Sequence, residues 1–175
     1  MNKPIVYFCK LNDTAVIPSK RDEDAGYDVY ANFIEDFMCF LPFQTKLVPT
    51  GIAGALPSDY YFQVEERSST GSKGIKKSAG VIDSGYRGEY KIAVTNCTLK
   101  PLVISKLSVE QLPSLISIEG QEFDINECFI HPYSKAIAQL VLHKVPCVEV
   151  KEITIDEFNK IPSLRGVDGF GSTNK

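Results

Sequence analysis

Asp83 is the residue whose type and setting best suit chemistry. It follows an apolar pair at residues 81–82 and precedes a glycine-containing turn that carries Tyr86. This pattern, continued by an alternating strand-like run, predicts a β-hairpin over residues 80–96. A carboxylate in that position is either a solvated turn residue or a general base held beside a binding pocket.

The C-terminal segment, residues 165–175, is the second candidate for chemistry. Its three glycines surround Phe170, a composition typical of a mobile arm whose backbone N–H groups can also wrap an anion. No lysine stands where a Walker phosphate-binding loop requires one, and no helix can follow. The segment is therefore either a frayed tail or an arm that becomes ordered on a ligand.

The composition indicates one globular domain. The chain has 175 residues and a net charge of −3, with no long run of like charge, so we expect no nucleic-acid partner. Its five cysteines are odd in number and far apart, which favours free thiols in a reducing cytoplasm. The N-terminus has no apolar signal core and no apolar run is long enough to cross a membrane, so we expect a cytoplasmic protein without a membrane partner.

Short apolar stretches separated by Gly and Pro dominate the chain. Strands are expected at residues 5–11, 25–31, 37–43, 46–56, 60–66, 102–107, 136–145 and 148–153. The best helix signal is a capping-box pattern at residues 154–157. Many strands with almost no helix predict an all-β sandwich, barrel or jelly roll.

Five short segments follow one another in a recognisable order. They are Ala25-Gly26-Tyr27-Asp28, Arg67-Ser68-Ser69, Gly80-Val81-Ile82-Asp83-Ser84-Gly85-Tyr86, Ala138-Gln139-Leu140 and Arg165-Gly166-Val167-Asp168-Gly169-Phe170-Gly171-Ser172-Thr173. Together they resemble the five motifs of the trimeric dUTPase family. Any one segment is weak support, whereas all of them in the right order make a strong signal.

This resemblance implies an enzyme that hydrolyses dUTP to dUMP and pyrophosphate, keeps uracil out of DNA and supplies the dTTP precursor. The implied fold is a dUTPase-like jelly roll, or β-clip, in a homotrimer. Residues 1–163 would form the β domain, and residues 164–175 a flexible arm that closes a neighbouring active site. Such a reaction needs a base for water, a divalent cation on the triphosphate and donors for the transition-state charge.

The resemblance also implies roles for individual residues. Asp83 would activate the attacking water, and Asp28 would hold Mg²⁺ through a water molecule, because Mg²⁺ prefers few carboxylates plus waters and phosphate oxygens. Tyr86 would lie against the deoxyribose and leave no room for a 2′-hydroxyl. The other expected contacts are Arg67, Ser68, Ser69, Gln139, Arg165, Gly171, Ser172 and Thr173 at or near the phosphates, Gly80, Val81, Ile82 and Phe170 at the uracil, and Lys91 elsewhere on the nucleotide.

These residues also have purely structural interpretations. Asp28 could be a polar residue on an exposed strand face, Tyr86 an ordinary turn aromatic and Gln139 a sheet residue. Arg67 could pair with a carboxylate at residues 65–66, a surface contact worth about 0–1 kcal/mol. The joint pattern favours the functional interpretation.

The chain departs from the family pattern in several places. Ser69 stands where many relatives have glycine, and Ser134-Lys135-Ala136 replaces a glycine-acid-base triplet. Asp168 and Asn174 replace the outer glycines of the last motif, and Asp168 would weaken the grip on the triphosphate unless it points outward. The segment 71–79 is also shorter than usual.

An insert at about residues 107–129 lengthens the connection between the third and fourth motifs. It mixes apolar and acidic residues. Some phage dUTPases resemble this chain in having an insert at the same place, where it serves partner contacts. The insert is therefore either a surface hairpin without a partner or a protein-binding or trimer-apex element.

Three other functions are conceivable. A dCTP deaminase shares the fold, but its family has glutamate three positions before Asn96, where this chain has Ala93. A regulatory protein that uses the scaffold as a nucleotide-sensing switch could coexist with catalysis. A zinc site has passable ligand spacing, but its second half overlaps the strand predicted at 136–145; its ligands would be Cys128, His131, His143 and Cys147.

Overall fold

The computed structural model describes residues 3–167, and the chain divides into two compact units, Met1–Val145 and Pro146–Lys175. All of the described strands belong to the first unit. The described part of the second unit contains one short helix, α2 (Ile155–Phe158). The expected boundary near residue 163, between a β domain and a C-terminal arm, stays a prediction.

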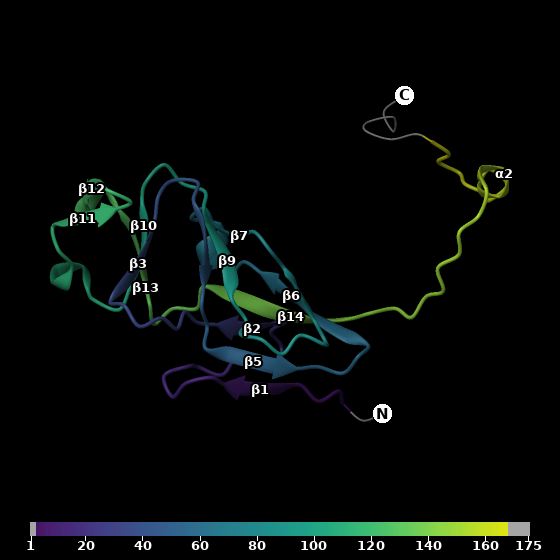
Figure 1. Cartoon of the computed structure of the whole chain (residues 1–175), viewed down its shortest axis with the longest axis horizontal. Coiled ribbons are helices and arrows are strands. Elements are labelled where there is room, and N and C mark those ends of the chain that lie inside the picture. The colour runs from purple at the N-terminus through teal and green to yellow at the C-terminus, as the bar shows by residue number, and fades with distance from the viewer. Residues whose placement is uncertain (1–2, 168–175) are drawn as a thin grey trace. The chain divides into compact units, whose positions relative to one another are not determined.

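Short strands build the first unit, as the sequence predicts (Figure 1). In chain order they are β1 (Tyr7–Lys10), β2 (Gly26–Val29), β3 (Phe37–Phe40), β4 (Thr45–Val48), β5 (Ile52–Ala55), β6 (Tyr60–Glu65), β7 (Ile75–Lys77), β8 (Val81–Asp83), β9 (Ile92–Asn96), β10 (Leu102–Ser105), β11 (Leu115–Ile118), β12 (Gln121–Asp124), β13 (Phe129–Pro132) and β14 (Ala138–Lys144). The sheet orders are β1-β5, β13-β10-β3, β11-β12, β2-β14-β6-β8 and β4-β9-β7. The expectation of an all-β fold is confirmed.

The four-stranded sheet β2-β14-β6-β8 has one apolar and one polar face. Phe62 of β6 and Leu140 of β14 are fully buried on the apolar face. Successive strand residues point to opposite faces, so Asp28, Gln139 and Asp83 lie on the other one. In Figure 1 β14 runs beside β6, and Asp28 on β2 is the direct neighbour of Gln139 on β14.

Aromatic rings join this sheet to the β1-β5 pair. Phe8 of β1 stacks on Phe62 with ring centroids 5.7 Å apart, and Tyr27 of β2 meets Phe62 edge-on at 6.0 Å. Burying such a ring contributes about 1.5–3 kcal/mol. The cluster therefore fixes β2, which carries Asp28, against the rest of the core.

β8 and β9 do not pair with each other, so the hairpin predicted over residues 80–96 is wrong. β8 pairs antiparallel with β6, whereas β9 pairs with β4 and β7. The chain leaves one sheet after Asp83 and enters the other at Ile92, and the buried Tyr90 anchors the connection by donating its N–H to the Ile52 carbonyl at 2.7 Å. A hairpin and such a crossover have the same local pattern of alternating residues and glycines. Only the pairing with strands far away in sequence distinguishes the two.

Other local expectations also need correction. The strand predicted at residues 148–153 is wrong, because that stretch has no strand partner and Val150 is 90% exposed. Residues 46–56 form two strands, since Gly51 with φ of +65° turns the chain between them. β7, β13 and the helix α1 (Ser68–Gly71) are short elements that the sequence pattern did not reveal.

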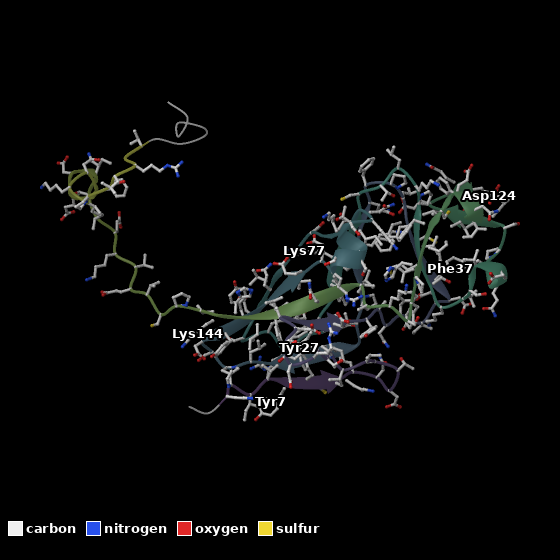
Figure 2. All side chains as sticks on the ribbon, turned by 180° about the vertical axis from the view of Figure 1, so that it is seen from behind. Tyr7, Tyr27, Phe37, Lys77, Asp124 and Lys144 are labelled. Atoms are coloured by element: carbon white, nitrogen blue, oxygen red, sulfur yellow. The ribbon has the colours of Figure 1, made fainter. Side chains whose placement is uncertain are left out.

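The insert, residues 107–129, is a compact unit beside β10 and β13 (Figure 1; Asp124 and the adjoining Phe37 are labelled in Figure 2). The antiparallel pair β11-β12 is flanked by the 3₁₀ helices η1 (Val109–Gln111) and η2 (Ile125–Glu127). Its small core, Leu112, Ile116, Ile118 and Ile125, packs against Val103 of β10. At the hairpin tip Glu119 accepts a hydrogen bond from Gln44 and lies 3.7 Å from Lys46 Nζ.

The predicted capping box is present at the start of α2. The Thr154 hydroxyl accepts from the Glu157 N–H at 3.3 Å, and the Glu157 carboxylate accepts from the Thr154 N–H at 2.8 Å. This pair satisfies two N–H groups that the helix itself cannot. Within residues 3–167 no helix is long and apolar enough to span a membrane.

Candidate functional site

Two pockets contain most of the predicted site residues that the structure describes. The β2 pocket has a volume of about 820 Å³ and is lined by Ser19, Lys20, Arg21, Glu23, Asp24, Ala25, Gly26, Asp28, Arg67, Ser68, Ser69 and Gln139. The β8 pocket has a volume of about 430 Å³ and is lined by Leu47, Val81, Ile82, Asp83, Tyr86, Glu89, Tyr90 and Lys91. Apart from Arg165, the described residues expected at the phosphates therefore line the β2 pocket, and apart from Gly80, those expected at the nucleoside line the β8 pocket.

Asp28 and Arg67 form an ion pair in the β2 pocket. Arg67 Nε lies 2.7 Å from Asp28 Oδ1, and each side chain is about one-third exposed at 33% and 30%. The alternative pairing of Arg67 with residues 65–66 is not the one formed. Two segments far apart in sequence thus meet side by side, and both partners can still reach a ligand.

Gln139 braces the same pocket from β14. Its Nε2 donates to the Glu66 carbonyl at 2.8 Å. Its side chain lies over Gly26, where any Cβ would collide with the Gln139 amide. The absence of a side chain at Gly26 therefore leaves the space that the Gln139 side chain occupies beside β2.

The helix α1 places its first two residues on the pocket. Ser68 and Ser69 are exposed, whereas Thr70 is buried and donates its hydroxyl to the Arg67 carbonyl at 3.0 Å. This bond fixes the chain direction directly after Arg67. The sequence predicts the roles of these serines but not the helix that presents them.

The loop before β2 is a part of the pocket that sequence reasoning missed. Arg21 closes it by bonding Asp24 through Nε at 2.8 Å and Nη2 at 3.0 Å. Lys20 also lines the pocket. The cluster of charged residues immediately before Ala25 is the signal that could have revealed this loop.

In the β8 pocket, Asp83 is exposed at the last residue of an edge strand. β8 pairs only with β6 among the described strands, so its other edge presents free backbone N–H and C=O groups. Gly80 directly precedes β8, and a side chain at Gly80 would collide with the side-chain amide of Gln63. The strand therefore offers both a carboxylate and an open row of backbone groups.

The turn after Asp83 is held by its own side chains and by β5. Glu89 accepts from the Gly51 N–H at 2.8 Å and lies 3.7 Å from Lys91 Nζ. Tyr90 is buried, and this burial raises the pKa of its hydroxyl. Lys91 lies in the β8 pocket as expected; its side chain is half-exposed, with Nζ beside the Glu89 carboxylate.

One chain keeps the two acidic residues far apart. Asp28 lies opposite Gln139, which lies opposite Glu65, whereas Asp83 lies opposite Tyr61 four residues along β6. With about 4.8 Å between strands and about 3.3 Å per residue, the three strand steps and four residues separate their Cα atoms by about 20 Å. A single chain cannot bring both carboxylates to one phosphate.

The described residues contain no cluster of three or more His, Cys, Asp or Glu side chains that could hold a metal. The two histidines of the hypothetical zinc site have other partners. His131 Nε2 lies 3.3 Å from the Lys135 carbonyl oxygen, and the His143 ring stacks on the Tyr61 ring with centroids 5.3 Å apart. A metal in the β2 pocket would have Asp28 as its expected carboxylate ligand, beside hydroxyl and amide oxygens; Glu23 and Asp24 also line the pocket, and Asp24 is paired with Arg21. That donor set fits Mg²⁺, which keeps several waters and binds through one or two carboxylates and phosphate oxygens.

The C-terminal part of the predicted site is only partly described. Arg165 lies in the second unit, and nothing places that unit relative to the pockets. The remaining predicted contacts, Phe170, Gly171, Ser172 and Thr173, lie outside the described residues, as do Asp168 and Asn174. Their roles stay predictions.

Comparison with known proteins agrees with this geometry. Residues 12–108 match the protein-family model described as dUTPase. A deoxyuridine 5'-triphosphate nucleotidohydrolase of Debaryomyces hansenii is 34% identical over 167 residues, which cover 94% of this chain and 84% of the relative. A match of this extent places the chain in one family with that relative.

Solved structures of phage dUTPases have a similar fold. The dUTPase of Staphylococcus bacteriophage 80alpha with dUPNHPP has a TM-score of 0.72 and 24% identity, and the match covers 96% of this chain and 97% of that one. A mutant dUTPase from phage phi11 of S. aureus, which reveals the coordination of a structural Mg(II) ion, has a TM-score of 0.64 and 20% identity over 85% and 96%. The arrangement of strands is therefore the all-β fold of these proteins.

Proposed function

Because the chain belongs to the dUTPase family, we propose that it is an enzyme that hydrolyses dUTP to dUMP and pyrophosphate. The observation that carries this proposal is the placement of Asp83 and Tyr86 on one small pocket, beside the open edge of β8. The reaction lowers the dUTP available for incorporation into DNA, and its product is the precursor of dTTP. The five free cysteines fit the reducing cytoplasm.

Asp83 is the general base of this reaction. Its carboxylate orients a water molecule and takes one of its protons while the water oxygen attacks the α-phosphorus. The bond from that phosphorus to the oxygen that bridges to the β-phosphorus breaks, and pyrophosphate leaves as dUMP forms. The pairing of Asp83 with Tyr61 holds its backbone in place, while its exposed side chain remains accessible to water.

The nucleoside occupies the β8 pocket. β8, which follows Gly80, presents backbone N–H and C=O groups on its open edge, which suits the donor and acceptor pattern of the uracil edge; the Gly80 carbonyl itself accepts from the Val64 N–H of β6 at 2.7 Å. Tyr86 is half-exposed on the same pocket and lies against the deoxyribose. Lys91 also lines this pocket.

The triphosphate occupies the β2 pocket. Arg67 donates to phosphate oxygens from its place beside Asp28, and the hydroxyls of Ser68 and Ser69 add neutral donors. Charge-assisted hydrogen bonds of this kind are about twice as strong as neutral ones. Asp28 would hold Mg²⁺ through water, and the bound ion would neutralise part of the triphosphate charge.

The active site is shared between chains of a homotrimer. The two pockets cannot serve one dUTP within one chain, because Asp28 and Asp83 are about 20 Å apart along the sheet. Leu47 and Val81, at the mouth of the β8 pocket, are 61% and 63% exposed, which suits a face that another chain covers. The β8 pocket of one chain then completes the β2 pocket of its neighbour.

Mixed trimers test the sharing of the site. Asp28→Asn and Asp83→Asn chains, each inactive alone, regain part of the wild-type turnover when they are refolded together, because some sites receive both intact carboxylates. Refolding each variant with itself is the control. Complete absence of recovery in mixtures that form trimers contradicts a shared site.

The C-terminal residues complete the site from a third chain. Arg165 contacts the γ-phosphate, Phe170 stacks on the uracil, and the segment 171–173 supplies phosphate donors. The support for this proposal is the match between this segment and the last motif of the family.

The insert serves as a protein-binding or trimer-apex element. It has its own small core, and Leu115 on β11 is 55% exposed. Deletion of residues 109–126 with a short turn in their place changes trimer stability, activity or partner capture. If all three survive unchanged, the insert has no such role.

Pyrophosphate release in the presence of Mg²⁺ tests the proposed function. dUTP, dCTP, dTTP and UTP are compared at equal concentration, and only dUTP is expected to release pyrophosphate efficiently. Ammonia release from dCTP would instead indicate a deaminase. No turnover of any of the four nucleotides by the trimer contradicts the assignment.

A further inference from the structure

We propose that Tyr90 and Arg87 are specificity-determining residues that hold the Tyr86 ring in place, so that the enzyme rejects a nucleotide with a 2′-hydroxyl. Arg87 does not line the β8 pocket, and Tyr90 lines it but is only 1% exposed, so neither side chain is expected to recognise the nucleotide directly. They act through Tyr86, and the inference rests on the proposed function because it assumes that Tyr86 lies against the deoxyribose.

The ring of Tyr90 supports the ring of Tyr86 from the protein side. The two rings are nearly parallel, with centroids 6.2 Å apart and planes inclined by 19°. Tyr86 is 49% exposed, whereas Tyr90 is 1% exposed. Tyr86 therefore has one side open to the pocket and the other side against a buried ring.

Tyr90 is itself fixed by the core. Its ring meets the fully buried Phe62 edge-on at 6.5 Å, its N–H donates to the Ile52 carbonyl at 2.7 Å, and its carbonyl accepts from the Thr50 hydroxyl at 2.5 Å. A series of rings thus leads from the pocket to the centre of the first unit. Close-packed interiors yield little to pressure, so Tyr86 cannot retreat toward the protein.

Arg87 fixes the backbone on both sides of the same ring. Its Nη1 donates to the Ser84 carbonyl at 2.6 Å and to the Tyr86 carbonyl at 3.0 Å. The Tyr86 hydroxyl donates to the Glu89 carbonyl at 3.2 Å across Gly88, where any side chain would collide with that hydroxyl. The ring is thereby held at its base, at its tip and on its inner face.

The Tyr90 hydroxyl has no part in this support. It is buried against Gly54 and has no hydrogen-bond partner in the part of the chain that the structure describes. The aromatic ring alone supplies the contact with Tyr86. Tyr90→Phe is therefore a matched control, because it removes the hydroxyl and keeps the ring.

To exclude the 2′-hydroxyl of a ribonucleotide, the Tyr86 ring beside the sugar must keep a fixed position. One additional oxygen on the sugar is a small difference, and a flexible pocket accepts such an addition with little penalty. If the space behind Tyr86 is empty or its backbone is loose, the ring moves aside and the 2′-hydroxyl fits. Discrimination between dUTP and UTP is then expected to fall more than the activity toward dUTP does.

The test compares kcat/KM for UTP and dUTP by pyrophosphate release in wild type, Tyr90→Leu and Tyr90→Phe. The ratio of UTP to dUTP is expected to rise about tenfold or more in Tyr90→Leu. Tyr90→Phe is expected to keep the wild-type ratio. Because both substrates are measured on one sample, the fraction of misfolded protein cancels from the ratio, and a purely structural defect leaves it unchanged.

Arg87→Ala provides a second test outside the core. Its side chain is exposed, so the variant is expected to fold, and the UTP-to-dUTP ratio is expected to rise by a smaller factor than in Tyr90→Leu. An unchanged ratio in either Tyr90→Leu or Arg87→Ala overturns the inference while the proposed function stands. If wild type releases no pyrophosphate from dUTP, the proposed function fails and this inference fails with it.

Discussion

The β2 pocket and the β8 pocket hold their residues in different ways. In the β2 pocket charged and polar side chains from separate segments hold one another, as Arg67 does with Asp28 at 2.7 Å and Gln139 with the Glu66 carbonyl at 2.8 Å. In the β8 pocket a single turn is fixed by its own backbone, by Arg87 and by stacked rings.

This difference matches what each pocket binds in the proposed reaction. A triphosphate is recognised by charge, and the Coulomb energy falls slowly with distance, so small displacements are tolerated. A nucleoside is recognised by shape and by short hydrogen bonds, which small displacements destroy. Changes in the β2 pocket should therefore weaken binding in a salt-dependent way, and changes in the β8 pocket should alter turnover and specificity.

The largest expected effect comes from removing the C-terminal segment that is proposed to close the shared site. Deleting residues 165–175 should abolish dUTP turnover and leave the trimer intact, because the proposed closure over the bound nucleotide would be lost. Turnover and size-exclusion chromatography measure the two outcomes. Removing only residues 174–175 is the matched control, and full activity of the longer truncation would show that the pockets need no lid.

Asp83→Asn should lower turnover by about 10²–10⁴, the usual contribution of a general base. dUTP should still bind with nearly wild-type Kd, because the amide keeps the shape of the β8 pocket. Single-turnover kinetics and calorimetric titration separate the two effects. Asp13→Asn, an exposed carboxylate outside both pockets, is the control, and near-normal turnover of Asp83→Asn would remove Asp83 from the mechanism.

Arg67→Ala should lower kcat/KM by about 10–10², since a hydrogen bond to a charged group contributes about 1.5–3 kcal/mol. The loss should shrink as NaCl is added, because salt screens the wild-type interaction. Arg67→Lys keeps the positive charge but lacks the planar guanidinium, so its kcat/KM should lie between those of wild type and Arg67→Ala. A loss that is independent of salt would show that the β2 pocket, like the β8 pocket, depends on shape.

Gly26→Ala should have the smallest effect and should act through Gln139. The new Cβ collides with the Gln139 side chain, so the free energy of unfolding should fall by about 1–3 kcal/mol, as for other overpacked sites. Chemical denaturation measures this loss. Gly85→Ala is the control, because a Cβ there meets nothing within 4 Å; equal stability of the two variants would contradict the close approach of Gln139 to β2.

Local features of the site were predictable from the chain. Alternation placed Asp28 on the strand face opposite its apolar neighbours, and the capping box at Thr154 is present as expected. The hairpin at residues 80–96 was predicted wrongly, because the partners of β8 and β9 are strands far away in sequence. The contribution of residues 19–24 to the β2 pocket was missed, since charged residues in a loop carry no periodic signal.

The sequence by itself determined which residues are available for chemistry and in what order, because residue type and spacing are local properties that a family pattern can match. Only the tertiary structure decided that Arg67 meets Asp28, that Tyr90 supports Tyr86, and that Asp28 and Asp83 lie at opposite edges of one sheet. The physical reason is that strand pairing is chosen by burial of the whole core. That choice rests on contacts between distant segments, which no local pattern contains.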